Sequence, residues 1–163
     1  MWRKLSSAAL DELVTESRQI ARRRKNLNLH QHSDETVQKL FIAMQADSYV
    51  RPHRHPEKEK IELFIAVRGR FAILLFDDQG GVQSLLEIGP GLADFGAEIL
   101  PGTWHTVIAL EDDSVFFEVK QGPYTPLSDK DFAPWAPPEG TPQTEQYLQW
   151  LHQAGPGDPS PSF

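Results

Sequence analysis

The stretch that decides the fold is Tyr49-Val50-Arg51-Pro52-His53-Arg54-His55, in which two histidines stand two positions apart. Residues two apart on a strand point to the same side of a sheet, with Cα atoms about 6.6 Å apart. Two imidazoles at that spacing can converge on one metal ion with bonds of about 2.0–2.1 Å. Arg51 shares their parity, so we expect its guanidinium in the same interior, where it suits a substrate carboxylate or phosphate.

Two further candidate ligands follow along the chain. Glu62 opens an apolar run that ends before Gly69, and His105 comes three residues after the turn Pro101-Gly102. Three imidazoles and one carboxylate suit one divalent iron, manganese, nickel, copper or zinc ion, with positions left for water or substrate. The second His-x-His pair, His30-Gln31-His32, lies in a polar segment and is interpreted as a solvated loop.

The rest of the pattern predicts an all-β domain with a helix at each end. Between Leu40 and Lys120, short β-type runs alternate with turns rich in Gly, Pro and Asp, which is typical of a sandwich or barrel. Helical spacing of apolar residues predicts a helix over 7–24, and Thr141-Pro142 begins a short one over 142–152. The predicted strands are 40–45, 49–55, 61–67, 71–76, 82–88, 93–95, 106–110 and 115–120.

The basic run Arg22-Arg23-Arg24-Lys25 has two interpretations. Positive charge suits the C-terminal end of the predicted helix, because it complements the helix dipole. The alternative is an anion-binding edge near the mouth of the barrel.

Length and composition indicate a single domain of 163 residues. We divide it into a helical extension (1–30), a β-barrel (31–132), a Pro-rich segment with a short helix (133–153) and a disordered tail (154–163). The net charge of −7 argues against nucleic acid as a partner, and the absence of cysteine excludes disulfides and thiolate sites. No apolar run is long enough for a signal peptide or a membrane span, so we expect a cytoplasmic protein.

Residues 51–69 resemble the first cupin motif, in which His-x-His is followed by Glu and then Gly, and 101–105 resemble the second. This resemblance implies a double-stranded β-helix, that is, a jelly-roll barrel, with the metal ion held by His53, His55, Glu62 and His105. Six residues separate His55 from Glu62, where the family has three or four. Glu59 fits that shorter spacing, but Glu62 keeps the usual distance to Gly69, and we prefer it.

A closer resemblance, to the WbuC-type cupin fold metalloproteins, runs from about residue 24 to about residue 151. It is carried by residues 71–78, 101–105, 117–124 and 129–135. Members of that family are often encoded among bacterial genes for O-antigen polysaccharide synthesis. The resemblance therefore implies a metal-binding protein for a small polar substrate, with sugar derivatives as candidates. Because cupins often pair through edge strands, it also implies a homodimer.

Three functions stay open on the sequence. The first is a mononuclear metal-dependent oxygenase or isomerase, using iron for oxygen chemistry or zinc or manganese as a Lewis acid. The second is a non-catalytic, ligand-binding or regulatory cupin. The third is a metal-independent sugar-nucleotide epimerase or isomerase, against which the complete ligand set argues. Candidate substrate contacts are Arg51, Trp104, Lys120 and Tyr124. Trp104 suits either an aromatic wall for a sugar ring or the core. The sequence does not identify a general acid or base.

Overall fold

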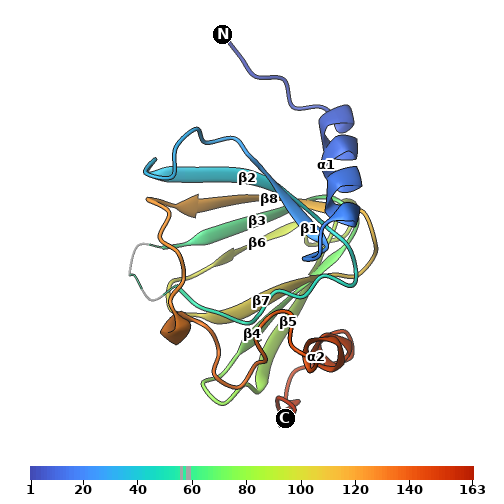
Figure 1. Ribbon diagram of the computed structural model, residues 1–163, viewed down its shortest axis with the longest axis vertical. Helices are drawn as coiled ribbons and strands as arrows, with labels where there is room; N and C mark the ends of the chain where they lie inside the picture. The colour runs from blue at the N-terminus through green and yellow to red at the C-terminus, as the bar shows by residue number, and fades with distance from the viewer. Residues whose placement is uncertain (56, 58–59) are drawn as a thin grey trace.

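The computed structural model describes residues 1–55, 57 and 60–163 (Figure 1). Two antiparallel sheets form its body, and one helix lies near each end of the chain. The elements run α1 (Ser7–Gln19), β1 (Arg24–Asn28), β2 (Val37–Met44), β3 (Glu62–Arg68), β4 (Phe71–Phe76), β5 (Val82–Ile88), β6 (Gly96–Ile99), β7 (Trp104–Ala109), β8 (Ser114–Gln121), a 3-10 turn η1 (Asp129–Asp131) and α2 (Thr144–Leu151).

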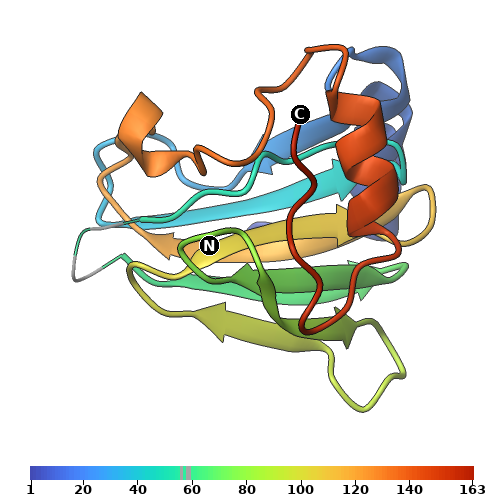
Figure 2. The same cartoon turned by 90° about the horizontal axis from the view of Figure 1, so that it is seen from below.

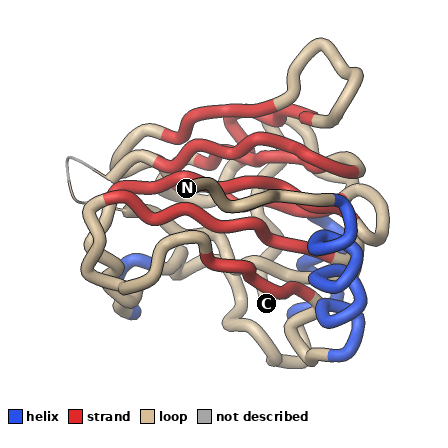
Figure 3. The backbone as a smooth tube through the Cα atoms, turned by 90° about the horizontal axis from the view of Figure 1, so that it is seen from above, coloured by secondary structure: helices blue, strands red, loops and turns tan. Residues whose placement is uncertain are grey.

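The strand order is that of a jelly roll. The larger sheet, whose strands lie side by side in Figure 3, has the order β1-β2-β8-β3-β6, and the smaller has β5-β4-β7. The segment before β3 extends the smaller sheet beyond β7, because the backbone N–H groups of His53 and His105 each donate to the other's carbonyl, at 3.0 and 2.9 Å. Five strands of the larger sheet thus lie opposite three strands and this extended segment, and the predicted fold class, an all-β jelly roll, is confirmed.

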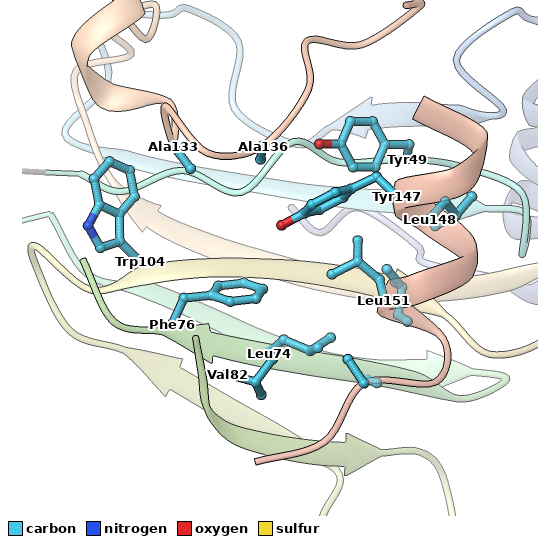
Figure 4. Close-up of a cluster of buried hydrophobic side chains, with 13 residues drawn as sticks. Tyr49, Leu74, Phe76, Val82, Trp104, Ala133, Ala136, Tyr147, Leu148 and Leu151 are labelled. Carbon is cyan, nitrogen blue, oxygen red and sulfur yellow. The ribbon is translucent and has the colours of Figure 1, made fainter. Parts of the chain in front are cut away.

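Three apolar clusters hold these layers together. One lies between the two sheets and closes one end of the interior with Met44, Phe64, Phe71 and Phe116. A second lies under α1, where Leu13 and Val14 cover the outer face of the larger sheet; a third lies under α2, on the outer face of the smaller sheet (Figure 4). Because the apolar filling stops part way along the interior, the other end is free for polar side chains.

The turn between β3 and β4 requires a glycine. Gly69 has φ +71°, in the left-handed region, and a Cβ there would collide with the side chain of Ser114 on β8. Only glycine adopts this conformation at little cost, and only glycine leaves room for the neighbouring strand. The glycine expected after the carboxylate in the sequence therefore fixes how β3 leads into β4.

The N-terminal helix is shorter than predicted. It ends at Gln19, and residues Arg24–Asn28 form β1, which pairs with β2. Arg23 turns the chain with φ 56° and Arg24 is buried, so the basic run lies at a sheet edge rather than in a last helical turn. Two other predictions are also corrected. Strand β6 is Gly96–Ile99 rather than 93–95, and residues 49–55 contain no strand but only an isolated bridge at His53.

The C-terminal residues, for which composition indicates disorder, contact the smaller sheet. The N–H of Val82 donates to the carbonyl of Asp158 at 2.9 Å, and the N–H of Gly157 donates back to Val82 at 2.8 Å. The ring of Phe163 lies 5.9 Å from that of Tyr147 on α2. Figure 2 shows this segment crossing in front of the sheet after α2.

Candidate metal centre

A cavity of about 420 Å³ occupies the part of the interior that the core leaves unfilled. Its walls come from the inner faces of β2, β3, β7 and β8 and from the extended segment around His53. Residues between 124 and 139 cover its mouth. The lining combines apolar side chains, among them Ile42, Met44, Val107 and Phe116, with buried polar ones such as Glu62, Glu118 and His105.

The four predicted ligands meet in this cavity. One ligand atom from each of His53, His55 and Glu62 lies within 4.8 Å of the others. His105 joins them from β7, with Nε2 2.9 Å from Oε2 of Glu62, while Nε2 of His55 lies 3.2 Å from Oε1. Glu62 and His105 are buried, at 4% and 2% exposed. Glu59, the alternative carboxylate, lies outside the described residues.

Backbone carbonyls hold two of the imidazoles in one tautomer. Nδ1 of His53 lies 3.0 Å from the carbonyl oxygen of Arg51, and Nδ1 of His105 lies 2.9 Å from that of Thr103. A carbonyl oxygen only accepts, so each Nδ1 carries the proton and donates. In the neutral rings the lone pair then belongs to Nε2, which is the arrangement of a metal-ligating histidine with its supporting partner.

The donor atoms fit a cation placed among them. Nε2 of His55, Nε2 of His105 and Oε2 of Glu62 are buried and make no hydrogen bond of normal geometry among the described residues, although short distances separate them. Two lone-pair atoms 2.9 Å apart repel unless a positive charge lies between them. Bonds of about 2.1 Å meeting at right angles put neighbouring ligand atoms roughly 3 Å apart, close to the observed 2.9 and 3.2 Å.

Burial and mutual contact set the charges of these groups. Burial, together with His105, lowers the pKa of His53 to about 3, so this ring is neutral at pH 7, as a ligand must be. Burial alone would raise the pKa of Glu62, but contacts with His105 and His55 outweigh it and hold the pKa well below its usual range. For His105 burial lowers the pKa and Glu62 raises it, with a net rise.

A buried ion pair lies beside the centre on β8. Nζ of Lys120 is 2.7 Å from Oε1 of Glu118 and 3.6 Å from Oε1 of Glu62. Burial lowers the pKa of Lys120, but the two carboxylates raise it more, so the amine stays charged. Burial raises the pKa of Glu118. The sequence left open which face of this strand is inside, and the structure puts Glu118 and Lys120 on the cavity side.

Of the other predicted substrate contacts, Arg51 and Tyr124 line the cavity and Trp104 does not. Arg51 lies over the ring of Phe132, 5.3 Å from its centroid, and Tyr124 is at the mouth, 54% exposed. Trp104 precedes His105 on β7 and so points to the opposite face, where its indole N–H donates to Asp78 at 3.0 Å. Of the two alternatives for Trp104, the structure has the core position, because Trp104 belongs to the cluster under α2.

Arg24 belongs to the basic run for which the sequence left two interpretations open, and the structure places it in the lining of the cavity. Arg24 donates to the carbonyl of Tyr49 at 2.8 Å and to Glu139 at 2.6 Å, which ties β1 to the segment over the mouth. The local sequence carries no signal for this contact, since 115 residues separate the two partners. His30 is explained by the backbone, because its Nδ1 lies 3.1 Å from the N–H of Lys39.

A family model described as a domain of unknown function (DUF6016) matches residues 5–88. No curated protein shows significant similarity to the sequence. No helix in the described part of the chain has the length and apolar character needed to cross a membrane.

Solved structures with a similar fold include KdgF from Halomonas sp., with 19% identity, TM-score 0.47, and coverage of 63% of this chain and 82% of that one. Oxalate decarboxylase from Bacillus subtilis has 15% identity and TM-score 0.48, and the match covers 69% of this chain but only 28% of that one. The cupin domain of Schizosaccharomyces pombe Cnp3 has 11% identity and TM-score 0.44, with 60% of each chain covered. Likeness at this level says nothing about what this chain binds.

Proposed function

The chain belongs to the DUF6016 family, and we propose that it is a metal-binding cupin that takes a small polar ligand at one divalent transition-metal ion. His53, His55, Glu62 and His105 would hold the ion. The observation that carries the proposal is the buried carboxylate of Glu62, which has Nε2 of His105 at 2.9 Å and Nε2 of His55 at 3.2 Å, with the His105 ring held in that orientation by the carbonyl of Thr103. That arrangement has a physical reason if a cation is bound, and is unfavourable for neutral rings without one.

Three nitrogens and one carboxylate oxygen suit iron, manganese, nickel, copper or zinc. When bound, such an ion would polarise a ligand oxygen as a Lewis acid. The chain's own residues would orient the ion's ligands and limit the access of water. His53 and His105 keep their orientation through Nδ1, and apolar walls such as Val107 and Phe116 keep bulk water from the inner side of the centre.

The convergence of four donors supports this function over that of a metal-independent epimerase. Such an enzyme would need one histidine paired with one carboxylate or tyrosine, whereas three imidazoles gather around the carboxylate of Glu62. Whether the centre turns over a substrate or only binds a ligand is a separate question. Oxygen uptake by the iron-loaded protein would assign it to the oxygenases.

Metal analysis of protein purified without chelator tests the proposal. We expect about one equivalent of a transition metal in the wild type, and little in His105→Ala or Glu62→Gln. His152→Ala is the matched control, because this exposed histidine contacts only the carbonyl of Ala46 among the described residues and should keep full metal content. A wild type that stays empty when offered each of the five metals would refute the proposal.

The finer predictions from the WbuC resemblance stay predictions. These are the sugar-derived substrate, the link to O-antigen synthesis and the homodimer, together with the cytoplasmic location.

A further inference from the structure

The charge of the cavity is opposite to that of the chain. The whole sequence carries −7, yet the described residues that line the cavity include five basic side chains and three acidic ones, a net charge of +2 with histidines neutral. The basic residues are Arg22, Arg24, Arg51, Lys60 and Lys120. The acidic ones are Glu62, Glu118 and Glu139. A divalent ion at the proposed centre would make the cavity more positive still, so its field attracts anions.

Most of this positive charge is already neutralised within the protein. Arg24 and Arg22 both pair with Glu139, at 2.6 and 3.4 Å, and Lys120 pairs with Glu118 at 2.7 Å. Arg51 differs from them. Among the described residues, no carboxylate lies within 4.0 Å of its guanidinium, and its one hydrogen bond goes from Nη2 to the carbonyl of Ala133 at 2.8 Å.

Arg51 is also close to the centre. It precedes His53 by two residues on an extended segment, and the carbonyl of Arg51 itself holds Nδ1 of His53. Both side chains lie against the ring of Phe132, with the guanidinium carbon 5.3 Å and the imidazole centroid 6.3 Å from its centroid. Nε of Arg51 is buried without a hydrogen-bond partner among the described residues. A charged donor group with unused capacity therefore lies beside the proposed ion.

We propose that the ligand is a small organic carboxylate, held at one end by the metal centre and at the other by Arg51. The inference rests on the proposed function for the position of the ion. A planar carboxylate matches the fork of a guanidinium. Phosphate sites add helix N-termini or several backbone N–H groups, but α1 and α2 cover the outer faces of the sheets. The apolar walls, with Leu40, Ile42 and Val107, suit a carbon skeleton rather than a bare inorganic ion.

Calorimetric titration with malonate tests the inference on the full chain, at fixed ionic strength, with and without manganese. Malonamide is the neutral isostere, and inorganic phosphate is the competing anion. We expect malonate to bind the manganese-loaded wild type with saturation, and malonamide not to. Arg51→Gln should weaken malonate binding at least about tenfold with metal content unchanged, since it removes a charge-assisted contact. Arg51→Lys keeps the positive charge but loses the fork of the guanidinium, so its affinity for malonate should lie between those of the wild type and Arg51→Gln.

Arg54→Gln is the matched control. Its Nε is likewise buried and unpartnered among the described residues, but its guanidinium lies 4.2 Å from the ring centroid of Trp104, outside the cavity. Malonate binding should be the same as in the wild type. Equal affinity in Arg51→Gln and the wild type, or phosphate binding at least as tight as malonate, would overturn the inference. A wild type that binds no metal would refute the proposed function but not the inference about Arg51. In that case, malonate binding that depends on Arg51 in the metal-free protein would still support a carboxylate ligand.

Discussion

Replacing His105 should remove most of the stabilisation that a bound metal ion gives to this protein. His105 is 2% exposed, and its Nε2 lies 2.9 Å from Glu62. His105→Ala therefore removes one of four donors without touching an outer surface. A ligand that binds only the folded state stabilises that state by mass action, so the loss is measurable as a change in melting temperature.

The magnitude follows from the size of the chain. Metal at about 100 times its dissociation constant stabilises the native state by about 2.7 kcal/mol. For a chain of 163 residues, 1 kcal/mol corresponds to about 3 °C, which gives a rise of about 8 °C. Loss of an outer partner of a ligand weakens metal affinity by about 10- to 100-fold, and loss of the ligand itself should do at least as much. At a 100-fold loss, the same metal concentration stabilises His105→Ala by only about 0.4 kcal/mol, or about 1 °C.

Intrinsic fluorescence from the four tryptophans can follow unfolding with and without metal. Each variant is compared with its own metal-free form, so any general effect of the substitution on stability cancels. His152→Ala should show the full rise. An equal rise in His105→Ala and the wild type would show that the ion binds elsewhere, and the reasoning about the four donors would be refuted.

Three further substitutions separate the scaffold from the site. Leu151→Ala should lower the free energy of unfolding by about 3 kcal/mol in a urea titration, because this α2 side chain is 1% exposed. Its metal content should stay normal. A loss of metal would contradict the separation between the cluster under α2 and the metal centre on the other face of the smaller sheet. Gly69→Ala should cost at least about 2 kcal/mol, from the positive φ and the collision with Ser114, and a neutral result would refute the tight turn. Lys120→Met should lower the free energy of unfolding by about 3 kcal/mol, because it leaves Glu118 buried without its cation. Lys120→Arg should recover part of this stability. Unchanged stability in Lys120→Met would show that the ion pair contributes little.

Local patterns in the sequence predict much of the sheet. Strands β4 and β5 have the bounds that alternation and turn residues predict, 71–76 and 82–88. Strand parity also predicts that His53 and His55 share a face, and the structure brings both to the carboxylate of Glu62. The same parity separates Trp104 from His105, since neighbours on a strand point to opposite faces.

The remaining differences concern contacts between distant parts of the chain. The predicted helix runs to residue 24, but β2 offers an edge to the following segment, and pairing with it makes Arg24–Asn28 a strand and buries Arg24. Strand β6 begins at Gly96, where the chain approaches the backbone of β3 too closely for a Cβ. The cover over the cavity depends on Glu139 and Arg24 meeting across the fold. Periodicity reports which face of an element is apolar, but not which other element covers it.

The precision of the centre follows from strand register. Glu62 is the Cα partner of Lys120 in the pairing of β3 with β8, and His53 is the partner of His105 across the smaller sheet. A slip of one residue in either ladder would turn a donor to the opposite face. His55 is held as well, because its carbonyl accepts from the N–H of Gly102 at 2.7 Å. The backbone on which each donor stands is thus fixed by contacts with a neighbouring strand or segment.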